Sequence, residues 1–185
     1  MGLSWFSKKK DAAAAPSEPP AASAPPAPSP TSPSVGRLLT EELVVFAPPG
    51  LDKDGLIEFL VRRLCEKKSL GAADPFLAKV LEREQGISTT LDTGLAIPHA
   101  RMDEIEDLAA ILGLIPRGMS DLKHAEFPIR AMFLFFSPNR QEAFTAHLHL
   151  LRGAAALFQS AFIEELLRQR AAAEILHRIR SKEGA

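Results

Sequence analysis

The chain has 185 residues, of which 46% are hydrophobic and 24% are charged, and its formal net charge at pH 7 is −1. This length predicts one domain with a single hydrophobic core, and the near-zero net charge argues against a nucleic-acid partner. Cys65 is the sole cysteine, which excludes an intramolecular disulfide and a zinc site built from cysteines.

The first 35 residues differ in composition from the rest of the chain. The segment Pro16 to Ser34 consists mainly of Ala, Pro and Ser and holds eight of the 15 prolines. It contains no bulky side chain that could form a core. We therefore expect residues 1–35 to be a disordered Ala/Pro/Ser-rich arm and residues 36–185 to be the folded domain.

The extreme N-terminus places Leu3, Trp5 and Phe6 ahead of three lysines, residues 8–10. A secretory signal has the reverse order, and the longest apolar runs, such as 131–136, are too short to span a bilayer. We therefore expect a cytoplasmic protein. Two interpretations of the terminus stay open: a frayed end, or a segment that docks weakly on a membrane or a partner.

The first half of the domain shows one strand and two helices. Leu43–Phe46 predicts a strand that ends at a Pro-Pro-Gly turn. Apolar residues at helical spacing predict an amphipathic helix over Lys53–Lys68. Asp74 followed by Pro75 is typical of a helix start, so a second helix is expected there.

The second half predicts buried strands followed by helices. Leu95–Ile97, Ala109–Ile115 and Ile129–Phe136 are apolar runs bounded by proline or glycine, which suits buried strands. From Phe144 to Ile179 the apolar residues recur at helical spacing. Helices at both ends with strands between them predict an α/β fold, a mixed β-sheet flanked by helices on both sides.

One segment carries the chemistry. A helix that ends near Arg83 is followed by a Ser- and Thr-rich loop and then by His99, directly after Pro98. A neutral imidazole is a nucleophile near pH 7, and loop hydroxyls and N–H groups stabilise a transferred phosphoryl group. The guanidinium of Arg83 suits phosphate oxygens better than an ammonium does.

These residues resemble a known active-site signature. Arg83-Glu84, Ser88-Thr89, Gly94 and the run Ala96-Ile-Pro-His99 are similar to the signature of phosphotransferase system (PTS) IIA domains of the fructose–mannitol class, which includes nitrogen-regulatory IIA proteins. A second landmark of that class, a histidine followed by leucine in a late helix, appears at His147. The resemblance spans about residues 39–179. The chain departs from the pattern at Thr90–Thr93 and at Ala100.

The resemblance implies a histidine phosphocarrier. His99 would carry the phosphoryl group, His147 would contact it or orient His99, and Arg83 would stabilise it, with Ser88 and Thr89 as phosphate-binding hydroxyls. The donor would be the histidine-containing phosphocarrier protein, and the acceptor a IIB domain or a regulatory target. No metal or organic cofactor is expected for this exchange.

The remaining histidines and the cysteine have simpler interpretations. His149 lies about 200° from His147 on a helix, so it is expected on a solvated face, whereas His147 borders an apolar stripe. That predicted stripe contains Phe144, Leu148, Leu151 and Ala155. His124 and His177 are expected in polar or surface positions, and Cys65 in a buried one.

Three alternatives to a phosphocarrier stay open. The first is a regulatory protein-binding module without obligatory phosphotransfer. The second is a hydrolase that uses His99 and His147 as base and acid. The third is zinc bound by both histidines and one carboxylate, which the absence of a helical histidine pair disfavours.

Overall fold

The computed structural model describes residues 33–86, 88–121 and 126–184. The predicted disordered arm and the N-terminal docking segment fall almost wholly outside these residues and stay predictions. The elements, in chain order, are α1 (Val35–Leu38), η1 (Glu41–Leu43), β1 (Val44–Phe46), α2 (Lys53–Lys68), α3 (Ala73–Gly86), β2 (Leu95–Ala96), β3 (His99–Met102), β4 (Ala109–Met119), β5 (Ile129–Pro138), η2 (Gln141–Ala143), α4 (Phe144–Leu157), α5 (Ser160–Leu167) and α6 (Ala172–Glu183).

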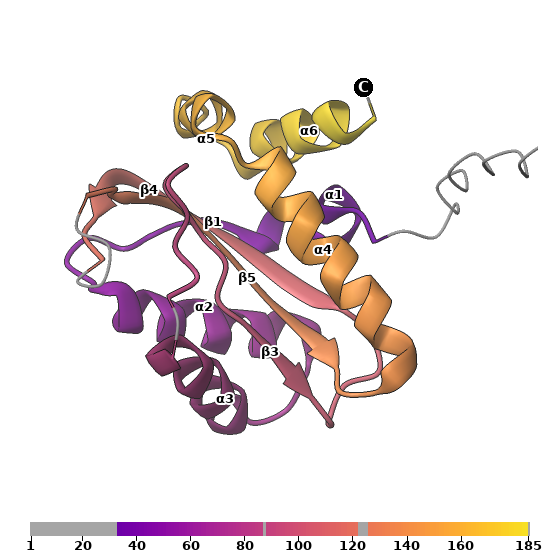
Figure 1. The fold of residues 1–185 in the computed structure, drawn as a ribbon. Helices are drawn as coiled ribbons and strands as arrows, with labels where there is room; N and C mark the ends of the chain where they lie inside the picture. The colour runs from indigo at the N-terminus through magenta and orange to yellow at the C-terminus, as the bar shows by residue number, and fades with distance from the viewer. Residues whose placement is uncertain (1–32, 87, 122–125, 185) are drawn as a thin grey trace, which may run out of the picture. The chain divides into compact units, whose positions relative to one another are not determined.

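The strands form one five-stranded sheet (Figure 1), which is mixed, as predicted, and β3 is a strand that was not predicted from the sequence. Its order is β1-β4-β5-β2, and β3 also pairs with β5. β4 and β5 are antiparallel, whereas β1 is parallel to β4 and both β2 and β3 are parallel to β5. The two central strands are buried along most of their length, which explains why their sequences are continuous apolar runs rather than alternating ones.

β2 and β3 are two halves of one edge strand. Ala96 pairs with Met132 and His99 pairs with Phe135, so the register along β5 is the same before and after the break. Pro98 stands in the break, and proline has no N–H to donate to a ladder. Its carbonyl still accepts from the N–H of Phe135 at 3.2 Å. The proline thus delivers His99 to the sheet edge in a fixed register.

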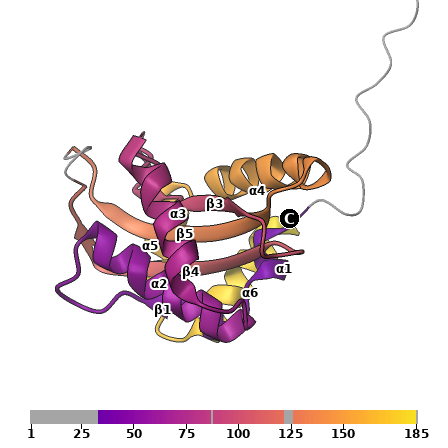
Figure 2. The ribbon, with the colours of Figure 1, turned by 90° about the horizontal axis from the view of Figure 1, so that it is seen from below.

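Helices cover both faces of the sheet, as predicted. α2 and α3 lie on one face, and α1, α4 and α6 lie on the other (Figures 1 and 2). Phe136 of β5 meets Phe76 of α3 on the first face, with ring centroids 4.8 Å apart. Phe133 meets Phe158, directly after α4, on the second face, at 5.8 Å. The edge strand β3 therefore lies between α3 on one side and α4 on the other.

Helix α2 has the predicted bounds because local signals define both of its ends. The side chain of Asp52 accepts from the N–H of Gly55 at 2.8 Å and caps the first turn. Ser69 adopts a left-handed conformation, with φ at 52°, and ends the helix. Among the described residues, no helix combines the length and the apolar composition that crossing a membrane requires.

Helix α4 differs from the prediction in the face that it buries. The buried residues are His147, Leu150, Ala154 and Leu157, whereas Phe144 and Leu148 of the predicted stripe are exposed. The prediction was wrong because α4 is apolar on two neighbouring faces and the pattern gives no weight to a buried histidine. His147 itself is held against the domain, as expected.

Candidate functional site

His99 is the first residue of β3 and lies half-buried at the edge of the sheet. Its Nδ1 is 2.7 Å from the carbonyl oxygen of Ile97. A carbonyl can only accept, so Nδ1 carries the proton and Nε2 carries the lone pair. The ring stacks on that of Phe135, with centroids 5.4 Å apart and planes inclined by 13°. These two contacts fix both the tautomer and the orientation of the imidazole.

His147 of α4 lies directly beside this ring. The two imidazoles meet edge to face with centroids 5.2 Å apart, and the side chain of His147 is 6% exposed. The hydroxyl of Ser137, the penultimate residue of β5, is 2.7 Å from its Nδ1. Burial of a polar ring requires such a partner, and Ser137 supplies it.

Both imidazoles are held in the neutral form. Burial lowers the pKa of His99, and Arg83 lowers it further, against the opposing effects of the Ile97 carbonyl and of Glu84. Burial, followed by His99 and Arg101, lowers the pKa of His147 to about 4. A histidine with a lowered pKa keeps its lone pair at neutral pH, so the resting site presents a nucleophilic nitrogen.

Arg83 is exposed in the last turn of α3, and its charge acts on His99. The structure thus brings the three predicted residues, His99, His147 and Arg83, to one edge of the sheet. Each comes from a different element: His99 from the edge strand, Arg83 from the helix on one face and His147 from the helix on the other. A guanidinium and two imidazoles that converge in this way can hold a dianionic group.

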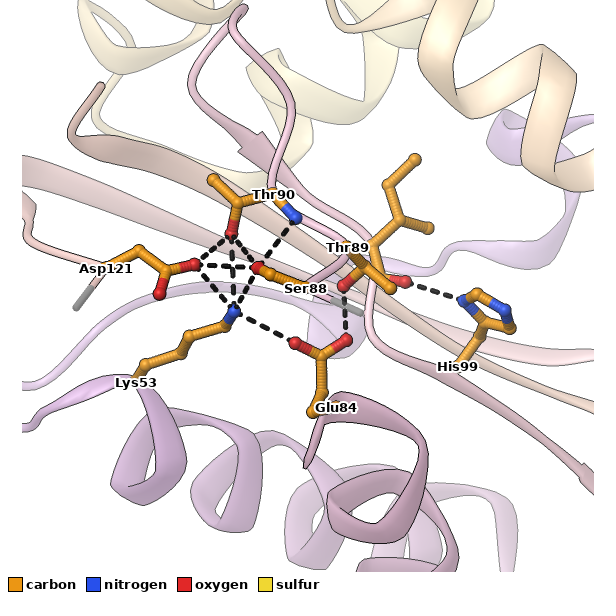
Figure 3. A network of polar contacts seen from close by, with 8 residues as sticks. Lys53, Glu84, Ser88, Thr89, Thr90, His99 and Asp121 are labelled. Atoms are coloured by element: carbon orange, nitrogen blue, oxygen red, sulfur yellow. Dashed lines mark hydrogen bonds and ion pairs between the residues drawn. The ribbon is translucent and has the colours of Figure 1, made fainter. Parts of the chain in front are cut away.

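The predicted hydroxyls, Ser88 and Thr89, are engaged with acidic residues. Thr89 donates to a carboxylate oxygen of Glu84 at 2.5 Å, and its carbonyl accepts from the N–H of Ile97 at 3.2 Å. Since the carbonyl of Ile97 binds His99, a continuous chain of contacts runs from Glu84 to the imidazole (Figure 3).

Ser88 belongs to a cluster that lies on the other side of Thr89 from His99 (Figure 3). The ammonium of Lys53 is 2.8 Å from Asp121, 2.9 Å from Glu84 and 2.9 Å from the Ser88 hydroxyl. Ser88 and Thr90 in turn donate to Asp121 at 2.8 and 2.6 Å. This cluster fastens the loop that precedes β2 to α2 and to the segment after β4.

The family follows from comparison with known proteins. The family model described as "phosphoenolpyruvate-dependent sugar phosphotransferase system, EIIA 2" matches residues 37–182. The chain belongs to this family. The match contains every element from η1 to α5 and all of the residues that form the site.

Two of the proteins that are similar to this EIIA chain are nitrogen regulatory proteins. The chain is 28% identical over 145 residues to a nitrogen regulatory protein of Pseudomonas aeruginosa, covering 77% of this chain and 92% of that protein. The crystal structure of the nitrogen regulatory protein IIA-Ntr from Neisseria meningitidis has a TM-score of 0.69 at 22% identity, covering 78% of this chain and 98% of that one.

A second solved structure shares the fold. The mannitol IIA enzyme of Escherichia coli, solved in complex with phosphorylated mannitol IIB, has a TM-score of 0.64 at 18% identity. The similarity covers 77% of this chain and 97% of the solved one. The mixed sheet with helices on both faces, as the sequence predicted, is therefore the fold that this chain shares with these solved IIA structures.

Besides the imidazole pair, this EIIA chain contains three histidines and one cysteine. His149 and His177 are exposed and Cys65 is buried, as expected, and burial raises the pKa of the Cys65 thiol to about 11. Asp92, in the loop that departs from the family pattern, is exposed. His124 lies outside the described residues. Within the described part of the chain, no group of three or more histidines, cysteines and carboxylates is arranged to hold a metal ion.

Sequence reasoning missed Ser137 and Arg101 at the imidazoles, and Lys53 and Asp121 in the cluster. Ser137 is one polar residue in an apolar strand, where a buried hydroxyl needs a partner. Arg101 follows His99 by two positions, which places both side chains on one face of a strand. These two signals are present in the sequence. Lys53 and Asp121 are 68 positions apart, and only the sheet topology brings them together.

Proposed function

We propose that this chain is a cytoplasmic histidine phosphocarrier that is phosphorylated on Nε2 of His99. The observation that carries the proposal is the contact between Nδ1 of His99 and the carbonyl of Ile97, 2.7 Å long, which leaves Nε2 as the free nucleophile. The family supplies the reaction class, phosphoryl transfer within a sugar phosphotransferase system. The proposed donor is the histidine-containing phosphocarrier protein.

The reaction is an in-line exchange between two nitrogens. The lone pair on Nε2 attacks phosphorus, the P–N bond to the donor imidazole breaks, and that electron pair returns to the donor nitrogen. The proton of His99 stays on Nδ1 and is donated to the Ile97 carbonyl throughout, so no base is required at this ring. Arg83 and His147 stabilise the charge on the transferred oxygens. Ser88 contacts Lys53 and Asp121, and Thr89 donates to Glu84. These contacts fix the loop whose Thr89 carbonyl accepts from the N–H of Ile97.

An exposed apolar surface beside the site supports protein donors and acceptors. Phe144 and Leu148 are 43% and 47% exposed on α4, next to the buried His147. The guanidinium of Arg101 lies over the ring of Phe144, 5.3 Å from its centroid. Exposed aromatic and aliphatic side chains of this kind mark protein interfaces. We propose that the phosphocarrier docks here and that a second protein later takes its place.

The acceptor is proposed to be either a IIB domain or a regulatory target. The mannitol IIA relative is solved in complex with phosphorylated IIB, which supports the first. The Pseudomonas relative is a nitrogen regulatory protein, which supports the second. Incubation of the phosphorylated chain with candidate IIB domains separates the two, because a true IIB acceptor removes the phosphoryl group within seconds to minutes.

Mass spectrometry tests the proposal directly. The full chain is incubated with phosphoenolpyruvate, enzyme I and the phosphocarrier protein, and its intact mass is measured. We expect one acid-labile phosphoryl group, which is lost in His99→Gln and retained in His149→Gln, a matched change at an exposed histidine. If an active donor system leaves the wild-type mass unchanged, the proposal is wrong and a protein-binding module without phosphotransfer takes its place.

The proposed docking surface has its own test. Phe144→Ser should raise the KM for the phosphocarrier about tenfold by removing an exposed anchor. Phe46→Ser is the control, because Phe46 is 38% exposed on β1, at the opposite edge of the sheet. Equal KM values for the two variants would contradict docking on α4.

A further inference from the structure

Arg101 lies on the same side of β3 as the nucleophile. It follows His99 by two positions, and side chains at that spacing on a strand point to one face. Their contacts agree: His99 meets His147 of α4, and Arg101 lies over Phe144 of the same helix. The guanidinium is therefore beside the imidazole pair, on the α4 side.

The structure holds this guanidinium in place without neutralising it. Nη2 donates to the carbonyl of Arg140 at 2.9 Å, and the ring of Phe144 lies beneath the group. Its Nε is buried and has no hydrogen-bond partner among the described residues. No carboxylate in the described ranges forms an ion pair with Arg101 either, whereas Arg130 and Arg178 each have one.

A partly buried arginine without an acidic partner is suited to an anionic ligand. Guanidinium is always charged at neutral pH and offers five N–H donors in a planar fork that matches phosphate oxygens. The charge of Arg101 acts on His147, as that of Arg83 acts on His99. Each imidazole is thus within range of the charge of a different arginine, one from α3 and one from β3.

We propose that Arg101 is a second phosphoryl-binding residue, which donates to the oxygens of the group on His99 from the α4 side while Arg83 does so from the α3 side. The inference rests on the proposed phosphorylation of His99. It assigns to a dianionic PO3 group those N–H donors of the Arg101 guanidinium that the Arg140 carbonyl does not use. Arg101 is then a catalytic residue, in direct contact with the group that is transferred.

The competing role for Arg101 is docking, in which it contacts the partner protein and never the phosphoryl group. The isolated phosphoprotein distinguishes the two roles, because no partner is present. A guanidinium in contact with a phosphoryl group favours the dianion and lowers the pKa of its second ionisation. A guanidinium that only contacts a partner leaves this pKa unchanged.

The experiment is a 31P NMR pH titration of the phosphorylated full chain, before and after Arg101→Gln. We expect the substitution to raise the phosphoryl pKa by about 1 unit and to slow acceptance from the phosphocarrier about ten- to hundredfold. Arg101→Lys keeps the charge without the fork and should give an intermediate pKa. Arg152→Gln, at an exposed arginine of α4, should change neither quantity.

The outcomes separate the inference from the proposed function. If wild type is phosphorylated on His99 but Arg101→Gln leaves the 31P titration unchanged, Arg101 does not contact the phosphoryl group and the inference is wrong, even if transfer slows. If wild type accepts no phosphoryl group from an active donor, the proposed function itself fails. A circular dichroism spectrum equal to that of wild type confirms that each variant is folded.

Discussion

The hydroxyl of Ser137 lies 2.7 Å from Nδ1 of His147, and both side chains are buried. If the hydroxyl donates, Nδ1 is the acceptor and the proton of the neutral ring is on Nε2, available to a phosphoryl oxygen. We predict that Ser137→Ala removes this preference. The 15N chemical shifts of the imidazole should then show a mixture of tautomers, and phosphoryl acceptance should fall about tenfold, the effect of about one hydrogen bond.

Ser160→Ala is the matched control, because it removes a hydroxyl that donates to the carbonyl of Thr93 on the surface. It should leave the His147 spectrum and the transfer rate at their wild-type values. An unchanged His147 spectrum in Ser137→Ala would show that Ser137 does not set the tautomer.

Acid should destabilise the fold through His147. Its pKa is about 4 in the folded protein and about 6.5 in an unfolded chain. Between these values the unfolded state binds more protons, so the stabilisation present above pH 6.5 is lost as the pH falls to 4, by up to about 1.4 kcal/mol per pH unit. We predict that the free energy of unfolding, measured in urea, falls less between pH 7 and pH 4.5 in His147→Gln than in wild type.

Carboxylates titrate in both proteins, so their contribution to the pH dependence of the unfolding free energy cancels when the two are compared over the same pH interval. Parallel curves for wild type and His147→Gln would mean that His147 has the same pKa in the folded and the unfolded state, which contradicts the lowered pKa.

Much of the fold is predictable because its signals are local. Helix α2 has a capping aspartate and a clear helical period, and its predicted bounds, Lys53–Lys68, are those observed. The central strands β4 and β5 are apolar throughout because helices cover both of their faces. The buried face of α4 was not predictable from hydrophobicity alone, since it contains His147, whose burial depends on Ser137 in another element.

The candidate site also contains residues that the sequence indicates and residues that only the fold brings together. The proline–histidine motif and the late histidine are sequence signals, and the structure brings His99 and His147 into contact. The polar cluster that fixes the loop before β2 is formed by residues that are far apart in the sequence. Lys53 stands at the start of α2 and Asp121 follows β4, so no window of sequence contains both, and the role of each depends on the register of the sheet.

The ammonium of Lys53 should be important for stability. It lies 2.8 to 2.9 Å from Asp121 and Glu84, which are 2% and 5% exposed. Lys53→Met leaves both buried carboxylates without this cation, and removal of one partner of a buried ion pair costs about 3–5 kcal/mol. Urea unfolding at pH 7 measures the loss. The double variant Lys53→Met/Asp121→Asn should recover part of it, because one of the two buried charges is then removed.

Lys79→Met is the control for Lys53. Lys79 pairs with Glu82 at 3.6 Å on an exposed turn of α3, and such pairs contribute less than about 1 kcal/mol. Equal losses in the two lysine variants would show that the Lys53 cluster contributes no more than a surface ion pair.

Gly94 should tolerate no side chain, although it lies five residues before the nucleophile. Its φ is +81°, and an added Cβ would lie 3.1 Å from the carbonyl oxygen of Pro128 and 3.3 Å from Cγ of Arg130. The carbonyl of Gly94 also accepts from the N–H of Arg130 at 2.7 Å, the contact that joins this loop to β5. Gly94→Ala therefore adds backbone strain and crowding at the start of the edge strand.

Gly71→Ala separates these two effects. Gly71 has a φ of +95° but nothing within 4 Å of an added Cβ, so its substitution should cost only the backbone strain, about 1–2 kcal/mol. We predict a larger loss for Gly94→Ala in urea unfolding, together with slower phosphoryl acceptance, because the displaced edge strand carries His99 out of register with Phe135. If the two variants lose equal stability and both keep wild-type transfer, close packing at Gly94 does not position the nucleophile.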